Sequence, residues 1–236
     1  MQRFFISDLH LSPGTPELAK AFSAFLANQA KHADELYILG DFFDAWIGDD
    51  EDHEFYTKII HELRATSDSG TKTYFLHGNR DFLIGKAFAE RCNITLLSET
   101  HSIVSGDKTV LLMHGDSLCT SDQEYMAFRA QVRNPAWQAQ ILALPLEQRR
   151  VMAAQLRNQS SSMNSNKAED IMDVNQEAVC AQFTEHSADI LLHGHTHRPA
   201  THTEGSQKRI VLGDWGNQAW YVHDADGDLS LNSYGI

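Results

Sequence analysis

The sequence predicts an α/β fold with a largely parallel sheet covered by helices, and two observations support this. Short apolar runs recur along the chain and end in glycine or polar residues, as in RFFISDLH (3–10) and ELYILGDFFD (35–44). Runs of this length, rich in Leu, aromatic and β-branched residues, are typical of buried strands. Helical patterns separate the first three runs, and strands joined through crossover helices form parallel sheets.

The elements are expected in the following order. Strands at 3–10, 35–44 and 72–81 alternate with helices at about 16–30 and 52–67, and further strands lie at 109–116 and 189–197. Toward the C-terminus the pattern changes to short runs joined by tight turns, RIVLGDWG (209–216), AWYVHD (219–224) and LSLNSYG (229–235). We expect these three to form an added antiparallel set. The parallel strands and the C-terminal antiparallel set together would form one sandwich of two sheets flanked by helices.

Residues 121–185 interrupt this core and are predicted to form a helical insertion. Residues 125–167 carry six basic side chains against one acidic side chain, and QSSSMNSN (159–166) is a low-complexity patch. Such a basic segment suggests an anionic partner, and we expect Arg149 and Arg150 to bind an anionic membrane surface. The apolar residues either pack as an ordinary helix face or form a surface for lipid. They include Phe128, Val132, Trp137, Ile141, Leu142, Leu144, Val151, Met152 and Leu156.

Length and composition limit the class of protein. The 236 residues suit one domain spanning 1–236, with the insertion inside it. The net charge of −13 argues against nonspecific nucleic-acid binding, because a phosphate backbone requires a basic face. Three widely spaced cysteines argue against a disulfide framework. The N-terminus does not resemble a signal peptide and no run is long enough to cross a bilayer, so we expect a cytoplasmic location.

Polar side chains suited to metal binding follow five of the predicted strands. In an open α/β sheet, ligands bind outside the carboxyl ends of the strands. Seven oxygen and nitrogen donors are too many for one tetrahedral zinc and fit two ions sharing a carboxylate, as in phosphoryl-transfer enzymes. Donors without thiolates suit Mn²⁺, Fe or Zn²⁺, with the hard donors favouring Mn²⁺. The seven are Asp8, His10, Asp41, Asn79, His114, His195 and His197.

Other patterns have simpler interpretations. His193 precedes the turn that carries His195 and His197, so we expect it to be packed or to orient its neighbours. GDDEDHE (48–54) is interpreted as a solvated helix start, and DADGD (224–228) as a hairpin turn without the glutamate of a calcium loop. No serine-hydrolase elbow or P-loop motif is present.

The ordered motifs DLH (8–10), GDFFD (40–44), GNRD (78–81), HGD (114–116) and GHTH (194–197) resemble those of the calcineurin-like metallophosphoesterases. The resemblance implies a four-layer α/β/β/α sandwich with a dinuclear metal site. It implies one ion held by Asp8, His10, Asp41 and His197, and a second held by Asp41, Asn79, His114 and His195. Asp41 would bridge the two ions.

Arg80 departs from many members of that family, which have histidine at this position of the motif. That histidine is placed to protonate an alkoxide leaving group, whereas an arginine side chain stays protonated and cannot act as a general acid. Arg80 can instead stabilise charge on phosphoryl oxygens in the transition state. A leaving group that needs no proton is implied, and this favours cleavage of a pyrophosphate.

The GNRD variant, the arginine-bearing insertion and the C-terminal GDWG are similar to one group within the family. Its members use Mn²⁺ to hydrolyse a UDP-linked diacylated glucosamine to UMP and a lipid-sugar 1-phosphate in lipid A biosynthesis. The resemblance implies a nucleotide-linked glycolipid substrate, peripheral binding at the cytoplasmic face of the inner membrane and no obligate protein partner. It implies catalytic roles for Asp41, Asn79, Arg80, His114 and His195. It implies substrate contacts by Asn79, Arg80, Asp122, Ser160, Asn164, Lys167 and His195.

Two alternatives stay open at this point. The same scaffold serves soluble nucleotide-sugar or dinucleotide pyrophosphatases and phosphoesterases, whose activity would not depend on acyl chains. A binding module of this fold that has lost its metals would be non-catalytic, although none of the seven donors is missing here.

Overall fold

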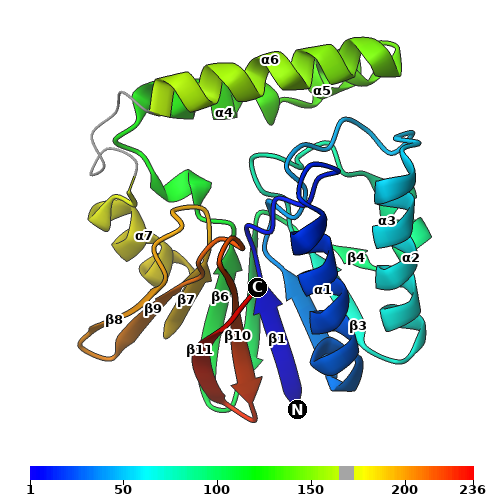
Figure 1. The fold of residues 1–236 in the computed structure, drawn as a ribbon. Helices are drawn as coiled ribbons and strands as arrows, with labels where there is room; N and C mark the ends of the chain where they lie inside the picture. The colour runs from blue at the N-terminus through cyan, green and yellow to red at the C-terminus, as the bar shows by residue number, and fades with distance from the viewer. Residues whose placement is uncertain (165–172) are drawn as a thin grey trace.

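The computed structural model describes residues 1–164 and 173–236, with side chains described in 1–157 and 173–236. Two sheets lie face to face at its centre (Figure 1). The strands of the first sheet are β1 (Gln2–Ile6), β2 (Glu35–Ile38), β3 (Lys72–Phe75), β4 (Thr95–Leu96), β10 (Gln218–Ala225) and β11 (Asp228–Gly235). Their order is β11-β10-β1-β2-β3-β4, and β1 to β4 are parallel.

The second sheet has five strands and carries the remaining motifs. They are β5 (Thr100–Ser105), β6 (Lys108–Met113), β7 (Ile190–His193), β8 (Ala200–Glu204) and β9 (Gln207–Val211). Their order is β5-β6-β7-β9-β8, with β6, β7 and β9 parallel. The expectation of one antiparallel set of three C-terminal strands is right for the β10–β11 hairpin and wrong for β9. β9 lies in the second sheet, where it pairs in parallel with β7 and antiparallel with β8.

Three buried clusters define the four layers expected for the fold. Side chains such as Phe5 and Leu112 fill the space between the two sheets. Phe22 and Phe75 belong to the cluster beneath α1 (Pro16–Asn28), α2 (Glu54–Asp68) and α3 (Lys86–Cys92), which cover the outer face of the first sheet. Phe183 of α7 (Gln176–His186) packs with residues of β6 and β7 on the outer face of the second. The α/β/β/α sandwich is confirmed.

Local sequence explains where the main helices begin. Pro16 opens α1 at the first helical position, where its missing N–H costs nothing. Leu18, Phe22 and Phe25 then recur at helical spacing on the buried face. The side chain of His53 accepts a hydrogen bond from the amide of Phe55 and caps α2. The predicted helices at 16–30 and 52–67 are confirmed in this way.

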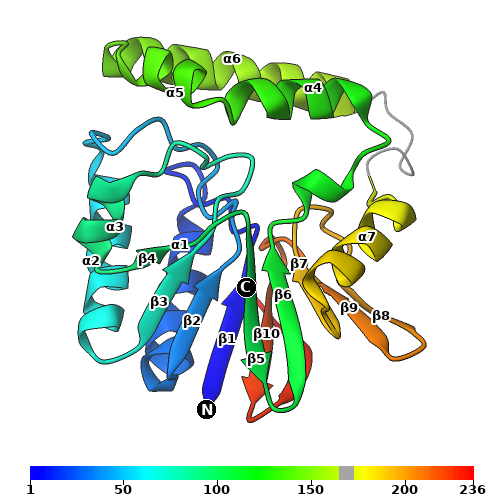
Figure 2. The ribbon, with the colours of Figure 1, turned by 180° about the vertical axis from the view of Figure 1, so that it is seen from behind.

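Helices α4 (Gln123–Val132), α5 (Pro135–Leu142) and α6 (Leu146–Asn164) lie across the end of the sandwich where the parallel strands finish (Figures 1 and 2). We refer to these three helices as the cap. The predicted insertion at 121–185 includes the cap and nearly all of α7. That residues 1–236 form one domain with this insertion inside it stays a prediction. Among the described residues, no helix is both long enough and apolar enough to traverse a bilayer.

Candidate active site

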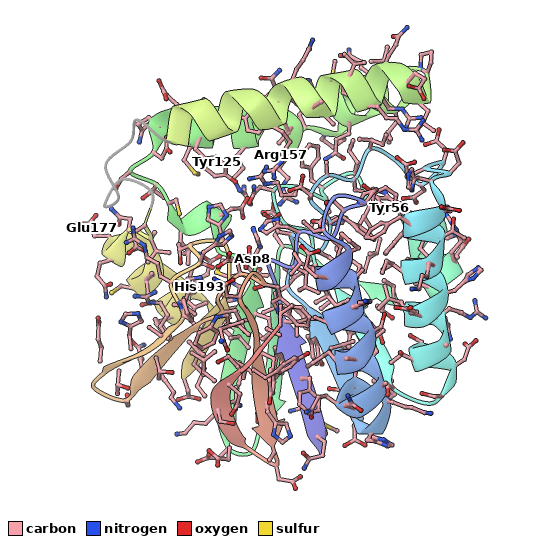
Figure 3. All side chains as sticks on the ribbon, viewed as in Figure 1. Asp8, Tyr56, Tyr125, Arg157, Glu177 and His193 are labelled. Atoms are coloured by element: carbon pink, nitrogen blue, oxygen red, sulfur yellow. The ribbon has the colours of Figure 1, made fainter. Side chains whose placement is uncertain are left out.

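The predicted metal ligands converge at the carboxyl ends of five strands, on the side of the sandwich that faces the cap. Asp8 and His10 follow β1, Asp41 follows β2, Asn79 follows β3, His114 follows β6, and His195 and His197 follow β7. Figure 3 shows Asp8 at the upper end of β1, with Tyr125 and Arg157 of the cap above it. Residues separated by almost 190 positions in the sequence therefore share one site.

The backbone at this site is strained. Asp8, His10, Asp41, His195 and His197 all have φ between 49° and 67°. Non-glycine residues rarely adopt this left-handed conformation, which costs on the order of 1–3 kcal/mol each and persists where the surrounding structure enforces it. Among the other non-glycine residues of the described chain, only Asn93, Ser187 and Asp226 share it. The strained residues therefore lie in the motifs whose side chains converge at the site.

Two glycines permit the close approach of the carboxylates. A Cβ atom on Gly78 would lie 2.1 Å from Oδ1 of Asp41, and one on Gly194 would lie 2.1 Å from Oδ2 of Asp8. Both carboxylates are almost fully buried. Any other residue at either glycine would therefore displace a predicted ligand.

Asp8, His10 and His197 form the first group of donors. Oδ1 of Asp8 lies 3.4 Å from Nε2 of His197, and the Nε2 atoms of His10 and His197 are 3.3 Å apart. Oδ2 of Asp8 accepts hydrogen bonds from the hydroxyl of Ser7 and the amide of His195. Oδ1 of Asp8 and Nδ1 of His10 are buried without a hydrogen-bond partner in the described structure. Orphaned buried donors and acceptors of this kind fit an ion site.

Asp41, Asn79, His114 and His195 form the second group. Oδ1 of Asn79 lies 2.9 Å from Nε2 of His114 and 2.8 Å from Nδ1 of His195. Nε2 of His114 is 3.6 Å from Oδ1 of Asp41, and its Nδ1 is 2.9 Å from the carbonyl of Leu39. The Leu39 carbonyl fixes the histidine ring, so its Nε2 is directed at the centre of the site.

The structure brings together two sets of potential metal ligands, and within each set the ligand atoms all lie within 4.8 Å of one another. The sets are Asp8–His10–His197 and Asp8–Asp41–His114. Asp8 is common to both sets. Asp41 belongs to only one of the two sets, so its predicted bridging role stays a prediction. The chemistry of the donors suits a divalent metal.

Burial and charge shift the pKa values across the site. Burial raises the pKa of Asp41 to about 7, while it lowers the pKa values of His10 and His195 to about 3. The pKa of Asp8 is held well below its usual range despite burial, by interactions with His197 and His114. The lowered pKa values of His10, His195 and Asp8 favour the protonation states that metal binding requires, whereas Asp41, with its raised pKa, would have to give up its proton on binding a metal.

Arg80 lies between this site and a cavity under the cap. Its amide donates to Oδ1 of Asp41 at 2.8 Å, and its Nε lies 3.8 Å from Oδ2 of the same carboxylate. The cavity has a volume of about 300 Å³. Its lining includes Asn79 and Arg80 at one end and the apolar side chains Phe82, Leu83, Phe128, Trp137, Ile141, Met152 and Leu156. A polar centre therefore opens directly onto an apolar wall.

The apolar residues of the cap divide between three environments. Phe128, Trp137, Ile141, Met152 and Leu156 line the cavity, Val132 is buried, and Leu142 and Val151 are 43% and 58% exposed. Part of the apolar face therefore packs against the sandwich, as at Ile141 and Val132, and part lines the cavity or is exposed, so both alternatives stay predictions.

The expectation that Arg149 and Arg150 face a membrane is wrong for Arg149, which is only 3% exposed. Its guanidinium donates to the carbonyl of Ile47 at 2.6 Å and to the carboxylate of Asp50. Arg150 pairs with Glu51 and with two further carboxylates. Most of these partners come from GDDEDHE (48–54), in which Glu51 is buried while Asp50 and Asp52 are 60% and 75% exposed. Since α2 begins at Glu54, the interpretation of that run as a solvated helix start holds except at Glu51. The run and the two arginines attach α6 to the sandwich.

The predicted substrate contacts on the cap are placed as follows. Asp122 is 7% exposed and its carboxylate accepts a hydrogen bond from the amide of Tyr125, so it caps α4. The side chains of Ser160 and Asn164, and Lys167 as a whole, lie outside the described residues. Their contacts with substrate stay a prediction. His193 is fully buried, as expected, with Nδ1 2.9 Å from the carbonyl of Gly194.

Sequence reasoning missed several residues around the cavity. Tyr125, Asp44 and Arg157 line it, and Arg157 pairs with Asp44. Asp44 is the last residue of GDFFD, and its position three residues after the predicted ligand Asp41 was a usable signal. Tyr125 stacks at a tilt against His195, with ring centroids 5.6 Å apart, and no local pattern marks it.

Comparison with known proteins agrees with this geometry. The model of the family described as calcineurin-like phosphoesterase matches residues 1–199. The chain belongs to the calcineurin-like phosphoesterase family. All seven predicted metal ligands of this calcineurin-like phosphoesterase fall inside the matched span.

Similar proteins span the full length of this calcineurin-like phosphoesterase. A protein of Cellvibrio japonicus (strain Ueda107) named UDP-2,3-diacylglucosamine hydrolase is 49% identical over 240 residues, with 100% of each chain covered. The protein of that name from Chromohalobacter salexigens is 52% identical, covering 96% of this chain and 94% of its own. The one from Escherichia coli (strain K12 / DH10B) is 46% identical, covering 98% of both.

Solved structures support the fold alone. An archaeal phosphodiesterase matches this calcineurin-like phosphoesterase with a TM-score of 0.52 at 12% identity, covering 100% of both chains. A single-residue variant of Vps29 from Entamoeba histolytica matches with a TM-score of 0.50 at 16% identity, covering 100% of this chain and 99% of its own.

Proposed function

We propose that this chain hydrolyses the pyrophosphate of UDP-2,3-diacylglucosamine, with water attacking the α-phosphorus. The products are UMP and 2,3-diacylglucosamine 1-phosphate, an intermediate of lipid A biosynthesis. The observation that carries this proposal is the cavity under the cap, which joins the polar loop of Asn79 and Arg80 to an apolar wall. A substrate with a pyrophosphate and acyl chains suits such a cavity, and relatives at 46–52% identity carry the corresponding name.

Two Mn²⁺ ions are the proposed cofactor. Asp8, His10, Asp41 and His197 would hold one ion, and Asp41, Asn79, His114 and His195 the other. The unpartnered Oδ1 of Asp8 and Nδ1 of His10 support a site for a cation at the first group. When bound, two divalent ions supply Lewis-acid activation of water and neutralise charge on the phosphoryl oxygens.

Arg80 stabilises negative charge on the phosphoryl group. Its guanidinium faces the cavity, and its Nε has no hydrogen-bond partner among the described residues. The amide of Arg80 is fixed on Asp41 at 2.8 Å, so the side chain projects from an anchored backbone. Since arginine stays protonated, the group that leaves must need no proton, and a sugar 1-phosphate satisfies this requirement. Asn79 and His195 contact the same phosphate.

The apolar wall of the cavity takes acyl chains of the substrate. Five cap residues, Phe128, Trp137, Ile141, Met152 and Leu156, supply apolar surface within reach of Arg80. Each buried methylene contributes about 0.8 kcal/mol. The exposed side chains of Leu142 and Val151 would touch the cytoplasmic face of the inner membrane, where a diacylated substrate resides. We therefore propose a cytoplasmic protein bound peripherally to that membrane.

The testing experiment compares UDP-2,3-diacylglucosamine with UDP-N-acetylglucosamine, which lacks the two long acyl chains. With Mn²⁺ present, we expect kcat/KM to be at least about 100-fold higher for the diacylated substrate, since several methylenes leave water on binding. Equal values for the two would favour a soluble nucleotide-sugar pyrophosphatase. Less than one Mn²⁺ per chain after loading, with neither substrate cleaved, would favour a non-catalytic binding module.

A further inference from the structure

The loop that presents Asn79 and Arg80 is held by hydrogen bonds from within the sandwich. Oδ1 of Asp81 accepts from the amide of Gly78 at 2.7 Å, and its Oδ2 accepts from the amide of Phe42 at 2.8 Å. The bond to Gly78 orients the planar peptide between His77 and Gly78, which also carries the His77 carbonyl. It leaves the next peptide, which carries the Gly78 carbonyl and leads into Asn79, to be fixed by another part of the chain.

Arg133 of the cap supplies that second restraint. It follows directly after α4, and its Nη2 donates to the carbonyl of His77 at 3.3 Å and to that of Gly78 at 3.0 Å. The side chain is 15% exposed. One guanidinium from the cap therefore holds two successive carbonyls immediately before Asn79 and Arg80.

Carboxylates from the sandwich hold the arginine in turn. Oδ2 of Asp116 lies 3.7 Å from Nη2 of Arg133, and Oε1 of Glu99 lies 3.6 Å from its Nε. Arg129, one turn earlier on α4, donates to the same two carboxylates at 2.8 Å each. Asp116 is 2% exposed and follows His114 by two residues, so this polar face of α4 contacts two metal-site loops at once.

Gly78 makes the restraint necessary. Because Asp41 approaches it so closely, this position excludes a side chain. Glycine, in turn, lets the adjoining peptides rotate more freely than any other residue would. Rotation there would withdraw the side-chain amide of Asn79 from His114 and His195. It would also withdraw the backbone N–H of Arg80 from Asp41. An external hydrogen-bond donor on both carbonyls prevents this rotation.

We propose that Arg133 is a positioning residue for the reaction: it fixes the peptides of His77 and Gly78 and so aligns Asn79 and Arg80. The inference rests on the proposed function. In the part of the chain with described side chains, the cavity is lined by Tyr125 and Phe128 of α4 but not by Arg133. Arg133 therefore affects the alignment of the reacting groups without forming part of the acyl-chain wall.

The test compares Arg133→Gln with Arg3→Gln. Arg3 is a matched control because its side chain is 12% exposed and also pairs with two carboxylates, Glu35 and Asp224, at the opposite ends of the strands. For Arg133→Gln we expect kcat to fall about 10- to 100-fold, as for other partners that orient metal ligands, with KM for UDP-2,3-diacylglucosamine within about threefold of wild type. Arg3→Gln should leave both constants near wild type.

Two further variants separate positioning from general stability. Arg133→Lys keeps the charge and one or two hydrogen bonds, so we expect it to recover a substantial part of kcat. Glu99→Gln weakens the ion pairs but leaves the carbonyl contacts, so we expect a kcat near wild type. Equal losses in Arg133→Gln and Arg3→Gln, or a Lys variant as slow as the Gln variant, would overturn the proposal.

Mn²⁺ binding without substrate provides an independent measurement. Electron paramagnetic resonance of free Mn²⁺ during titration should show affinity weakened by about tenfold or more in Arg133→Gln, because Asn79 is a proposed ligand. Unchanged affinity in this variant would contradict the proposal. If the wild-type protein binds Mn²⁺ but leaves UDP-2,3-diacylglucosamine intact, the proposed function fails, and this titration still decides the role of Arg133.

Discussion

Replacing Gly194 with alanine tests the geometry of the first donor group. The new Cβ would lie 2.1 Å from Oδ2 of Asp8 and 2.2 Å from Oγ of Ser7, whereas ordinary contacts begin at 3.4 Å. Asp8 would therefore have to move by about 1.3 Å, and a displacement near 1 Å of a reacting group costs about 10²-fold in rate. Both neighbours are fully buried, so overpacking should also cost about 1–3 kcal/mol of stability.

The assay is steady-state hydrolysis of UDP-2,3-diacylglucosamine with Mn²⁺, together with urea unfolding. Gly14→Ala is the matched control, since its Cβ would meet only Oγ of Ser12 at 3.7 Å, an ordinary contact. We expect kcat to fall about 100-fold or more in Gly194→Ala and to be unchanged in Gly14→Ala. A Gly194→Ala protein with more than half of the wild-type kcat would refute the assignment of Asp8 to a fixed ligand position.

Three other variants test separate parts of the account. Arg80→Met should lower kcat about 10²- to 10³-fold through lost charge stabilisation, and an unchanged rate would contradict that role. Arg149→Ala should lower the free energy of unfolding by about 2 kcal/mol by leaving Asp50 and a buried carbonyl unpaired, whereas Arg150→Gln, at a more exposed side chain, should destabilise the fold less. Burial lowers the pKa of His193 from 6.5 to about 4, so the unfolded chain binds its proton first and stability is lost as pH falls through this range. Urea unfolding of His193→Gln between pH 4 and 6.5 should therefore depend less on pH than wild type, and an identical dependence would contradict a buried neutral imidazole.

Much of the fold was predictable because its central strands are local, apolar and bounded by glycine. The runs that became β1, β2, β3, β6 and β7 carry their own signal. The two-residue β4 and the alternating, half-polar β5 and β8 carry little apolar signal and were missed. The placement of β9 beside β7 was also missed, because pairing partners are chosen by long-range packing and not by the strand's own sequence.

The candidate site shows a similar division. The donors were visible because each sits in a strand-end motif, where the topology itself brings side chains together. The contacts of the cap residues were harder to predict, because a basic segment has the same sequence pattern whether it binds lipid or a neighbouring loop. The environment of Arg149 depends on Asp50, 99 residues away, and no local feature reveals that contact. Tyr125 approaches His195 only through the packing of α4 over the motifs.

The central claim is that water attacks the α-phosphorus of a UDP-linked glycolipid at this site. Hydrolysis of UDP-2,3-diacylglucosamine in ¹⁸O-labelled water with Mn²⁺, followed by mass spectrometry of both products, tests it most directly. The account predicts the label in UMP and unlabelled 2,3-diacylglucosamine 1-phosphate. Label in the lipid product, or no cleavage by a chain that binds Mn²⁺, would contradict it.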